Sequence, residues 1–267
     1  MNLENPVLIK ELRERMRGRI AFILLTVYLL FLFAVLFLAW PHISRYYPGW
    51  DVGREIFQGI SMILMAIVVF ITPSFTSGAI SSERERKTLD LLITTLLKPR
   101  TIVFGKMIAS LSYLVLLLAA SLPFISVSFM FGGVAPSEVA TAYFILIVTM
   151  FTVATIAMFF SILFKKTFIA SGASYGIILF LVLGTIFLDV VLDQYYLYRE
   201  PILSKHLNPF FAITSIYERG PTFIATSIIG LKIPAWGNVI LIYTAISIVL
   251  LFIILRYFEP LLKRGGK

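Results

Sequence analysis

The apolar residues of this chain fall into six long uncharged runs, which are separated by shorter segments that hold most of the charges. An α-helix needs about 20 apolar residues to cross the ~30 Å hydrocarbon layer of a bilayer. Each of the six runs is long enough to do so. The pattern therefore predicts an all-α membrane protein with six transmembrane helices and one domain over 1–267. The predicted spans are approximately 20–40, 56–79, 105–131, 139–164, 168–190 and 236–257.

Glycine and proline divide and bend these runs. Gly132, Gly133 and Pro136 interrupt a long apolar stretch, which predicts a short turn between the third and fourth spans. Pro73 and Pro123 lie inside predicted spans, where a proline removes one backbone hydrogen bond and kinks the helix. Such kinks could serve helix packing or provide a flexible wall for a pathway, and the sequence leaves both interpretations open.

Composition excludes several classes of function. The chain is 59% hydrophobic and only 14% charged, whereas a soluble domain is roughly 45–50% apolar. It has no cysteine, which excludes disulfides, thiol catalysis and cysteine metal sites. Its two histidines, His42 and His206, stand far apart without a cluster of carboxylates. We therefore predict no metal site, no bound cofactor and no catalytic site in this chain.

Lysine and arginine are distributed unequally between alternate connecting segments. Seventeen of them lie in the segments 1–19, 83–106, 165–166 and 256–267, and six lie in 42–55 and 193–232. Because positive residues gather on the cytoplasmic side, we predict a multi-pass protein of the inner (cytoplasmic) membrane with both termini in the cytoplasm. The net charge of +9 then reflects topology and contact with anionic lipid, not the binding of nucleic acid.

The first 19 residues have the pattern of an amphipathic helix lying on the membrane surface. Asn5 and Pro6 suit a helix start, and apolar residues then recur at spacings of three and four. This segment could also simply extend the first span, but its charge density is too high for hydrocarbon. The predicted membrane-surface residues are Lys10, Arg13, Arg15, Arg17 and Arg19.

The loop after the second span predicts a further cytoplasmic helix. Ser82 followed by Glu85 has the pattern of a capping box, in which each side chain binds an unpaired amide of the first helical turn. An apolar stripe follows, and Pro99 ends the pattern. We predict a short helix over 82–99 that lies along the membrane and joins two spans stiffly.

The same loop resembles the one between spans two and three of the ABC-2-type transporter permeases. The matching residues are Glu83-Arg84-Glu85-Arg86, Thr88-Leu89-Asp90-Leu91-Leu92, Arg100 and Gly105-Lys106. The resemblance implies a coupling helix that docks into a cleft of an ATP-binding subunit. It assigns this role to Glu83, Arg84, Glu85, Arg86, Thr88, Leu89, Asp90 and Leu92.

Two neighbouring features bear on this coupling role. Family members often have glycine before the threonine, and the lysine here, Lys87, predicts a stiffer and more basic helix. The resemblance also implies a second ATPase contact at Lys165 and Lys166, although these two lysines could equally serve only to fix topology.

The resemblance further implies the function and the partners. The chain has no G-x-x-x-x-G-K-[ST] phosphate loop, so we expect it to be a transport subunit, not an enzyme. ATP and Mg²⁺ would be bound by a separate ATP-binding subunit. A second copy of the chain, or a related permease, would complete an exporter in the membrane.

The segment between the last two spans, Asp189–Trp236, is too long for a simple connection. Within it, Gly220–Leu231 is uncharged but too short to cross a bilayer, which predicts a re-entrant or interfacial helix. Asp189 and Asp193 share one helix face and either line an exit or mark the membrane interface.

Other classes of function place different demands on the sequence. An ion-coupled carrier or an intramembrane enzyme usually has ionisable groups at the middle of the membrane, and the six uncharged runs argue against both. A membrane anchor without transport activity would not require the pattern seen over 82–99. Five polar residues inside the spans could line a pathway or could serve hydrogen bonds between helices. They are Gln58, Ser61, Thr72, Thr149 and Thr155.

Overall fold

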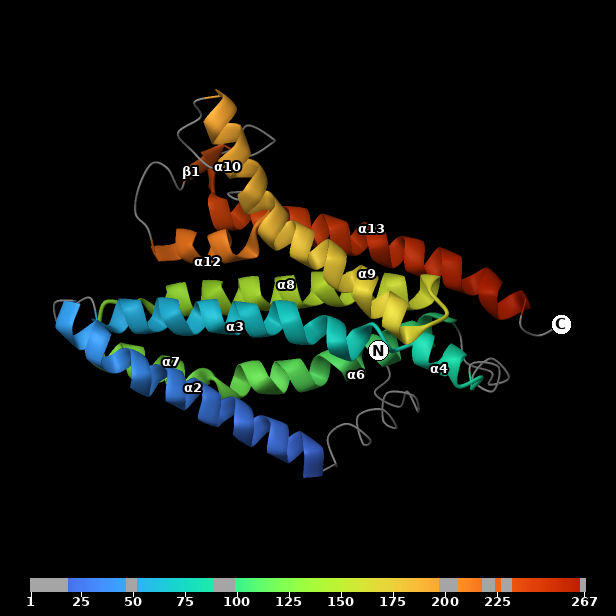
Figure 1. Cartoon of the computed structure of the whole chain (residues 1–267), viewed down its shortest axis with the longest axis horizontal. Helices are drawn as coiled ribbons and strands as arrows, with labels where there is room; N and C mark the ends of the chain where they lie inside the picture. Colours follow the sequence, from blue (N-terminus) through green and yellow to red (C-terminus); the bar gives the residue numbers. More distant parts are fainter. Residues whose placement is uncertain are drawn as a thin grey trace.

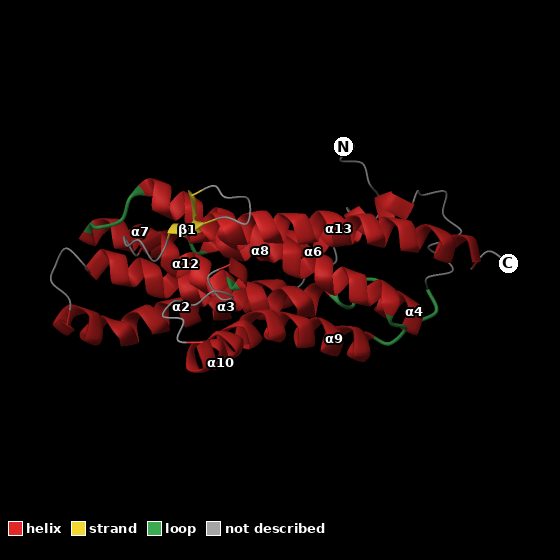
Figure 2. Cartoon of the chain, turned by 90° about the horizontal axis from the view of Figure 1, so that it is seen from above, coloured by secondary structure: helices red, strands yellow, loops and turns green. Residues whose placement is uncertain are grey.

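The structure, a computed structural model, is an elongated bundle of helices (Figures 1 and 2). It describes residues 19–46, 52–88, 99–196, 206–217, 224–226 and 232–264. Six helical stretches are long and apolar enough to cross a membrane, which confirms the predicted architecture. They run over Ala21–Trp40, Val52–Glu85, Arg100–Phe131, Pro136–Leu163, Thr167–Leu192 and Ala235–Phe258.

Several of these stretches consist of more than one element. The first three spans contain α2 (Arg19–Tyr46), α3 (Val52–Thr76), α4 (Ser81–Glu85), α6 (Pro99–Ala120) and α7 (Leu122–Phe131). The later helices are α8 (Pro136–Leu163), α9 (Thr167–Leu179), the π-helix η1 (Phe180–Gly184), α10 (Thr185–Tyr196), α12 (Pro209–Tyr217) and α13 (Ala235–Arg264). Two short strands, β1 (Ile224–Thr226) and β2 (Lys232–Pro234), lie before α13.

The centre of the bundle is formed by α3 and α8, which pack against each other. In the apolar 18-residue stretch of the fourth span, 72% of the residues are buried, whereas only 11% are buried in the corresponding stretches of the first and fifth spans. The outer helices therefore leave large apolar side chains such as Phe22, Phe168 and Phe187 on the surface. Such an exposed apolar surface is stable in hydrocarbon and would not be stable in water.

The bundle has two distinct ends, which we name by the helices that lie there. The α4 end holds α4, the α8–α9 connection and the C-terminal part of α13, and the α7 end holds the end of α7 and the start of α8 (Figure 1). The α10 helix leans away from the bundle axis (Figure 1). All the described residues that the sequence assigns to ATPase coupling lie at the α4 end.

The predicted turn between the third and fourth spans is confirmed. Gly132 and Gly133 adopt φ angles of 78° and 82°, a conformation that glycine reaches without steric cost. Pro123 lies in the first turn of α7, so it divides the third span into α6 and α7. Pro73 remains inside α3.

The segment between the fifth and sixth spans differs from the prediction. Ile224 to Thr226 form a strand that pairs antiparallel with Lys232 to Pro234, so the helix predicted over Gly220–Leu231 is wrong at 224–226. Residues 220–223 and 227–231 lie outside the described part. The β-branched side chains of Ile224 and Thr226 favour a strand, which a count of uncharged residues does not reveal.

One side chain joins this segment to the fifth span. Asn208 Oδ1 accepts a hydrogen bond of 2.9 Å from the backbone N–H of Phe210 at the start of α12. Its Nδ2 donates to the carbonyl of Val182 at 2.8 Å, within the π-helix. Asn208 therefore caps α12 and also connects the start of α12 to the π-helix.

Candidate docking site at the α4 end

The helix predicted over 82–99 is shorter than expected in the described part of the chain. The α4 helix ends at Glu85, Arg86 follows as its C-cap, and Thr88 is not helical. The predicted capping box does not form, because Ser82 is the second residue of α4 and not its N-cap, and the Ser82 hydroxyl donates to the Gly78 carbonyl. Residues 89–98 lie outside the described part.

Lys87 has the left-handed conformation with a φ of 58°. It directly follows the helix C-cap, a position where glycine is usual. Its backbone N–H donates to the Arg84 carbonyl at 3.1 Å, and the N–H of Thr88 donates to the Glu83 carbonyl at 2.9 Å. The expectation that lysine here stiffens a continuous helix is therefore wrong, since the helix ends at this point and lysine adopts the glycine conformation.

Glu83 binds two other parts of the α4 end. Its carboxylate lies 3.1 Å from the Nζ of Lys106 in α6, and it also accepts a hydrogen bond from the hydroxyl of Thr88. The Lys106 side chain is only 5% exposed. A buried ammonium of this kind requires a charged or hydrogen-bonding partner, so Glu83 holds the end of the second span against the start of the third.

Glu85 points to a different helix. Its carboxylate accepts hydrogen bonds from the hydroxyl of Thr167 at 2.9 Å and from the backbone N–H of Thr167 at 3.3 Å. Thr167 is the first residue of α9, where unpaired N–H groups and the helix dipole favour a carboxylate. Glu85 therefore caps the fifth span and brings the loop after α4 beside the loop before α9.

The remaining predicted coupling residues that the structure describes surround this contact. Arg86, Lys165 and Lys166 are exposed, as is Lys87, which follows Arg86 in the chain. Arg84 is half-buried. Together these side chains make the α4 end strongly basic. Arg86, Lys87, Lys165 and Lys166 form the exposed group, which we call the basic patch.

Several predicted residues lie outside the described part of the chain. They are Leu89, Asp90, Leu92, Lys10, Arg13, Arg15 and Arg17. Arg19 is exposed and begins α2. Lys106 and Thr167 receive the Glu83 and Glu85 side chains, and sequence reasoning did not assign them a coupling role. For Thr167 the only signal was a polar side chain at the start of an apolar span, whereas Lys106 also belongs to the Gly105-Lys106 pair of the family resemblance.

The polar residues inside the spans serve contacts between and within helices. Ser61 bonds Tyr217 at 3.3 Å, and the hydroxyls of Thr72 and Thr155 donate to carbonyls of their own helices. Gln58 is half-buried. This favours the packing interpretation over an open pathway for these residues.

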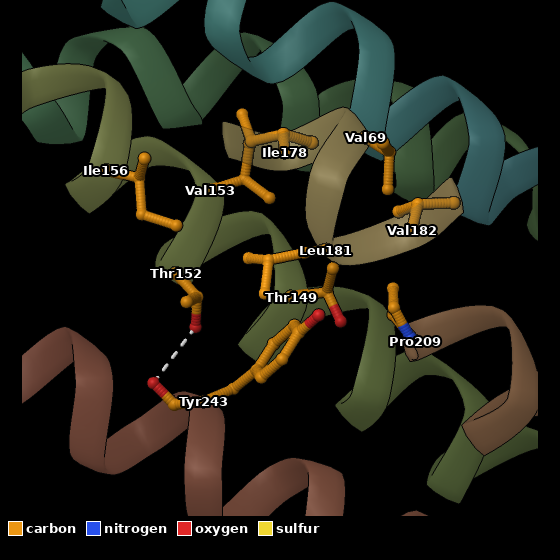
Figure 3. A pocket seen from close by; sticks show the side chains of 10 residues that line it. All are labelled: Val69, Thr149, Thr152, Val153, Ile156, Ile178, Leu181, Val182, Pro209 and Tyr243. Atoms are coloured by element: carbon orange, nitrogen blue, oxygen red, sulfur yellow. Dashed lines mark hydrogen bonds between the residues drawn. The ribbon is translucent and has the colours of Figure 1, made fainter. Parts of the chain in front are cut away.

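A small cavity between spans two, four, five and six contains the other polar residue of this group (Figure 3). Thr149 and Thr152 of α8 face Tyr243 of α13 across it (Figure 3). Thr152 donates to the Tyr243 carbonyl at 3.2 Å, and Ser247 donates to Thr152 at 2.9 Å. Among the described residues, the buried Thr149 hydroxyl oxygen makes no hydrogen bond.

Comparison with known families identifies the chain. The family model described as "ABC-2 family transporter protein" matches residues 5–259. The chain belongs to the ABC-2 transporter family. No curated protein matches it. As an ABC-2 family member with six membrane-length helices, the chain is a multi-pass membrane protein and the membrane component of an ABC transporter. Members of this family pair with an ATP-binding subunit and typically have no ATP-binding site of their own.

Proposed function

We propose that this chain is the permease subunit of an ATP-driven exporter, and that its α4 end docks onto a separate ATP-binding subunit. The observation that supports this most directly is the arrangement of the α4 end. There, the exposed basic patch is formed by the loop after α4 and the loop before α9. Glu83 and Glu85 of α4 bind the third and the fifth span, respectively. The family match gives the class of partner.

The structure supports a division of labour within the α4 end. The four residues of the basic patch are exposed and available to an acidic surface on the ATP-binding subunit. Glu83 and Glu85 instead bind Lys106 and Thr167 of this chain. We therefore assign docking to the basic residues together with 88–92, and internal fastening to the two glutamates.

The remaining parts of the proposal concern topology and assembly. Docking at the α4 end requires that this end faces the cytoplasm, in agreement with the excess of lysine and arginine in its segments. ATP and Mg²⁺ would bind to the partner. The apolar surfaces of α2 and α9 would contact lipid and a second permease copy or a related permease.

The test is to co-express this chain with a candidate ATP-binding subunit and to purify the pair. We expect a complex whose ATP hydrolysis depends on the permease. Reversing the charges in Arg86→Glu with Lys87→Glu, or in Lys165→Glu with Lys166→Glu, should weaken the complex by about tenfold or more.

The matched control is Ser137→Glu, which adds an exposed negative charge at the α7 end and should leave the complex intact. The proposal is contradicted if no complex forms, or if both charge reversals leave the stimulated hydrolysis unchanged. A flux that depends on membrane potential in the absence of any ATPase would favour the ion-coupled carrier instead.

A further inference from the structure

The second span is interrupted just before α4. The α3 helix ends at Thr76, and residues 77–80 form a turn that leads into α4. The backbone N–H groups of Ile80 and Ser81 both donate to the hydroxyl of Ser161 in α8, at 2.9 and 3.0 Å. Ser161 is fully buried. A side chain of the fourth span therefore replaces the carbonyls that a continuous helix would have supplied from the second.

The fifth span holds α4 from the other side. Glu85 caps α9 through Thr167, and the Ser81 hydroxyl also donates to the Thr167 hydroxyl at 3.3 Å. The α4 and α9 helices lie in contact (Figure 2). Gly78 lies beside this contact, and a Cβ atom at this position would be at an ordinary contact distance of 3.4 Å from the Thr167 methyl group. These contacts join α4 to the start of the α8–α9 hairpin.

We propose that Glu85 and Ser161 are positioning residues that transmit movement of α4 into the hairpin formed by the fourth and fifth spans. This inference rests on the proposed function, because it takes the ATP-binding subunit as the source of the movement. The turn 77–80 separates α4 from α3, while side-chain hydrogen bonds join α4 directly to α8 and α9. A displacement of α4 therefore moves α8 and α9 through the hydrogen bonds of Ser161 and Glu85. It moves α3 less, because only the turn 77–80 connects α4 to α3.

The experiment follows the fifth span during ATP binding. The chain has no cysteine, so Ile169→Cys introduces a single thiol on the exposed face of α9. An environment-sensitive fluorophore is attached to it before assembly with the ATP-binding subunit in vesicles. We expect ATP to change its emission in the otherwise unaltered chain, and we expect this change to be lost in Glu85→Ala and in Ser161→Ala although the complex still forms.

Three further variants separate positioning from other roles. Glu85→Gln keeps an oxygen that accepts from Thr167, so it should restore the emission change. Glu138→Ala removes a glutamate that binds the N–H of Ala135 and thus caps α8 at the α7 end. Ser174→Ala removes a buried hydroxyl that donates within α9, to the Ala170 carbonyl. Both controls should retain the emission change.

The outcomes distinguish this inference from the proposed function. If the unaltered chain forms no complex, the proposed function fails and this inference fails with it. If the complex forms and Glu85→Ala and Ser161→Ala still respond to ATP, only this inference is overturned. It is also overturned if Glu85→Gln behaves like Glu85→Ala, or if Glu138→Ala loses the response equally. Should Ser161→Ala fail to fold because it leaves two buried N–H groups without an acceptor, Glu85→Ala, at an exposed position, decides the question.

Discussion

The two ends of the bundle are held together in different ways. At the α4 end, side chains reach between helices: Glu83 binds Lys106 of α6, and Glu85 binds Thr167 of α9. At the α7 end, the backbones themselves are in close contact. A Cβ atom on Gly53 of α3 would lie 2.1 Å from the Gly132 carbonyl oxygen and 2.4 Å from that of Ser128.

The glutamates at the two ends show the same contrast. Glu138 caps its own helix by accepting a hydrogen bond from the N–H of Ala135, three residues earlier. Glu85 caps a helix that begins 82 residues later in the chain. A local cap stabilises one helix, whereas a cap supplied by another element also makes two elements move together. We infer that the α7 end is built for close packing and the α4 end for connection between its loops.

The largest effect is expected from breaking the backbone contact at the α7 end. Gly53→Ala places a methyl group against two carbonyl oxygens, which cannot move aside as a flexible side chain can. We expect α3 and α7 to separate and the free energy of unfolding to fall by about 3 kcal/mol. Thermal unfolding in detergent measures this loss.

The control for this substitution lies in the same helix. A Cβ atom on Gly59, which is exposed, would have no other side chain or neighbouring helix within 4 Å. Gly59→Ala should therefore be neutral or slightly stabilising, because alanine is the better helix former. Equal melting temperatures for the two variants would show that the close contact at Gly53 does not determine stability at this end.

An intermediate effect is expected from the charge pair at the α4 end. Glu83→Gln leaves the Lys106 ammonium without its charged partner, and Lys106→Met does the same to the Glu83 carboxylate. Each should reduce the free energy of unfolding by about 2 kcal/mol. The double variant should lose about 1 kcal/mol less than the sum of the two. Chemical unfolding of all four proteins measures this coupling. Arg100→Met, at an exposed position early in the same helix, should change little, and additive losses would contradict a direct pairing.

The smallest effect concerns the left-handed residue after α4. Lys87→Gly removes the steric cost of a φ of 58°, although it also adds conformational freedom to the unfolded chain. We expect the first effect to be larger and the free energy of unfolding to rise by about 0.5 kcal/mol. Lys166 is extended, with a φ of −106°, and Lys166→Gly should therefore give a small loss. The opposite signs can be read from paired melting curves, and a loss in both variants would refute the strain at Lys87.

The fold could be predicted to the extent that it depends on local properties of the sequence. A run of about 20 apolar residues has few alternatives to a membrane-spanning helix, and Gly132 and Gly133 determine a turn through their own φ angles. A helix does begin beside Ser82, at Ser81, but the capping box predicted from Ser82 and Glu85 is wrong, because a local pattern does not reveal that these side chains bind Gly78 and Thr167 instead.

The connections at the candidate site could not be predicted in the same way. Ser161 is 80 residues from Ser81 in the sequence, and nothing in the pattern around either residue indicates the other. Asn208 and Val182 are likewise 26 residues apart. Pairings of this kind depend on how the spans pack, and buried serines are common in membrane helices for many packing reasons.

Docking of the α4 end onto the ATP-binding subunit can be tested by cross-linking. A photoreactive amino acid is placed singly at Arg86, at Lys166 and, for comparison, at Ser137 of the α7 end, all three of which are exposed. Each variant is co-expressed with the ATP-binding subunit and irradiated. We expect covalent adducts with that subunit from Arg86 and Lys166 and none from Ser137. Adducts from Ser137 alone, or an active complex without adducts from Arg86 and Lys166, would contradict docking at the α4 end.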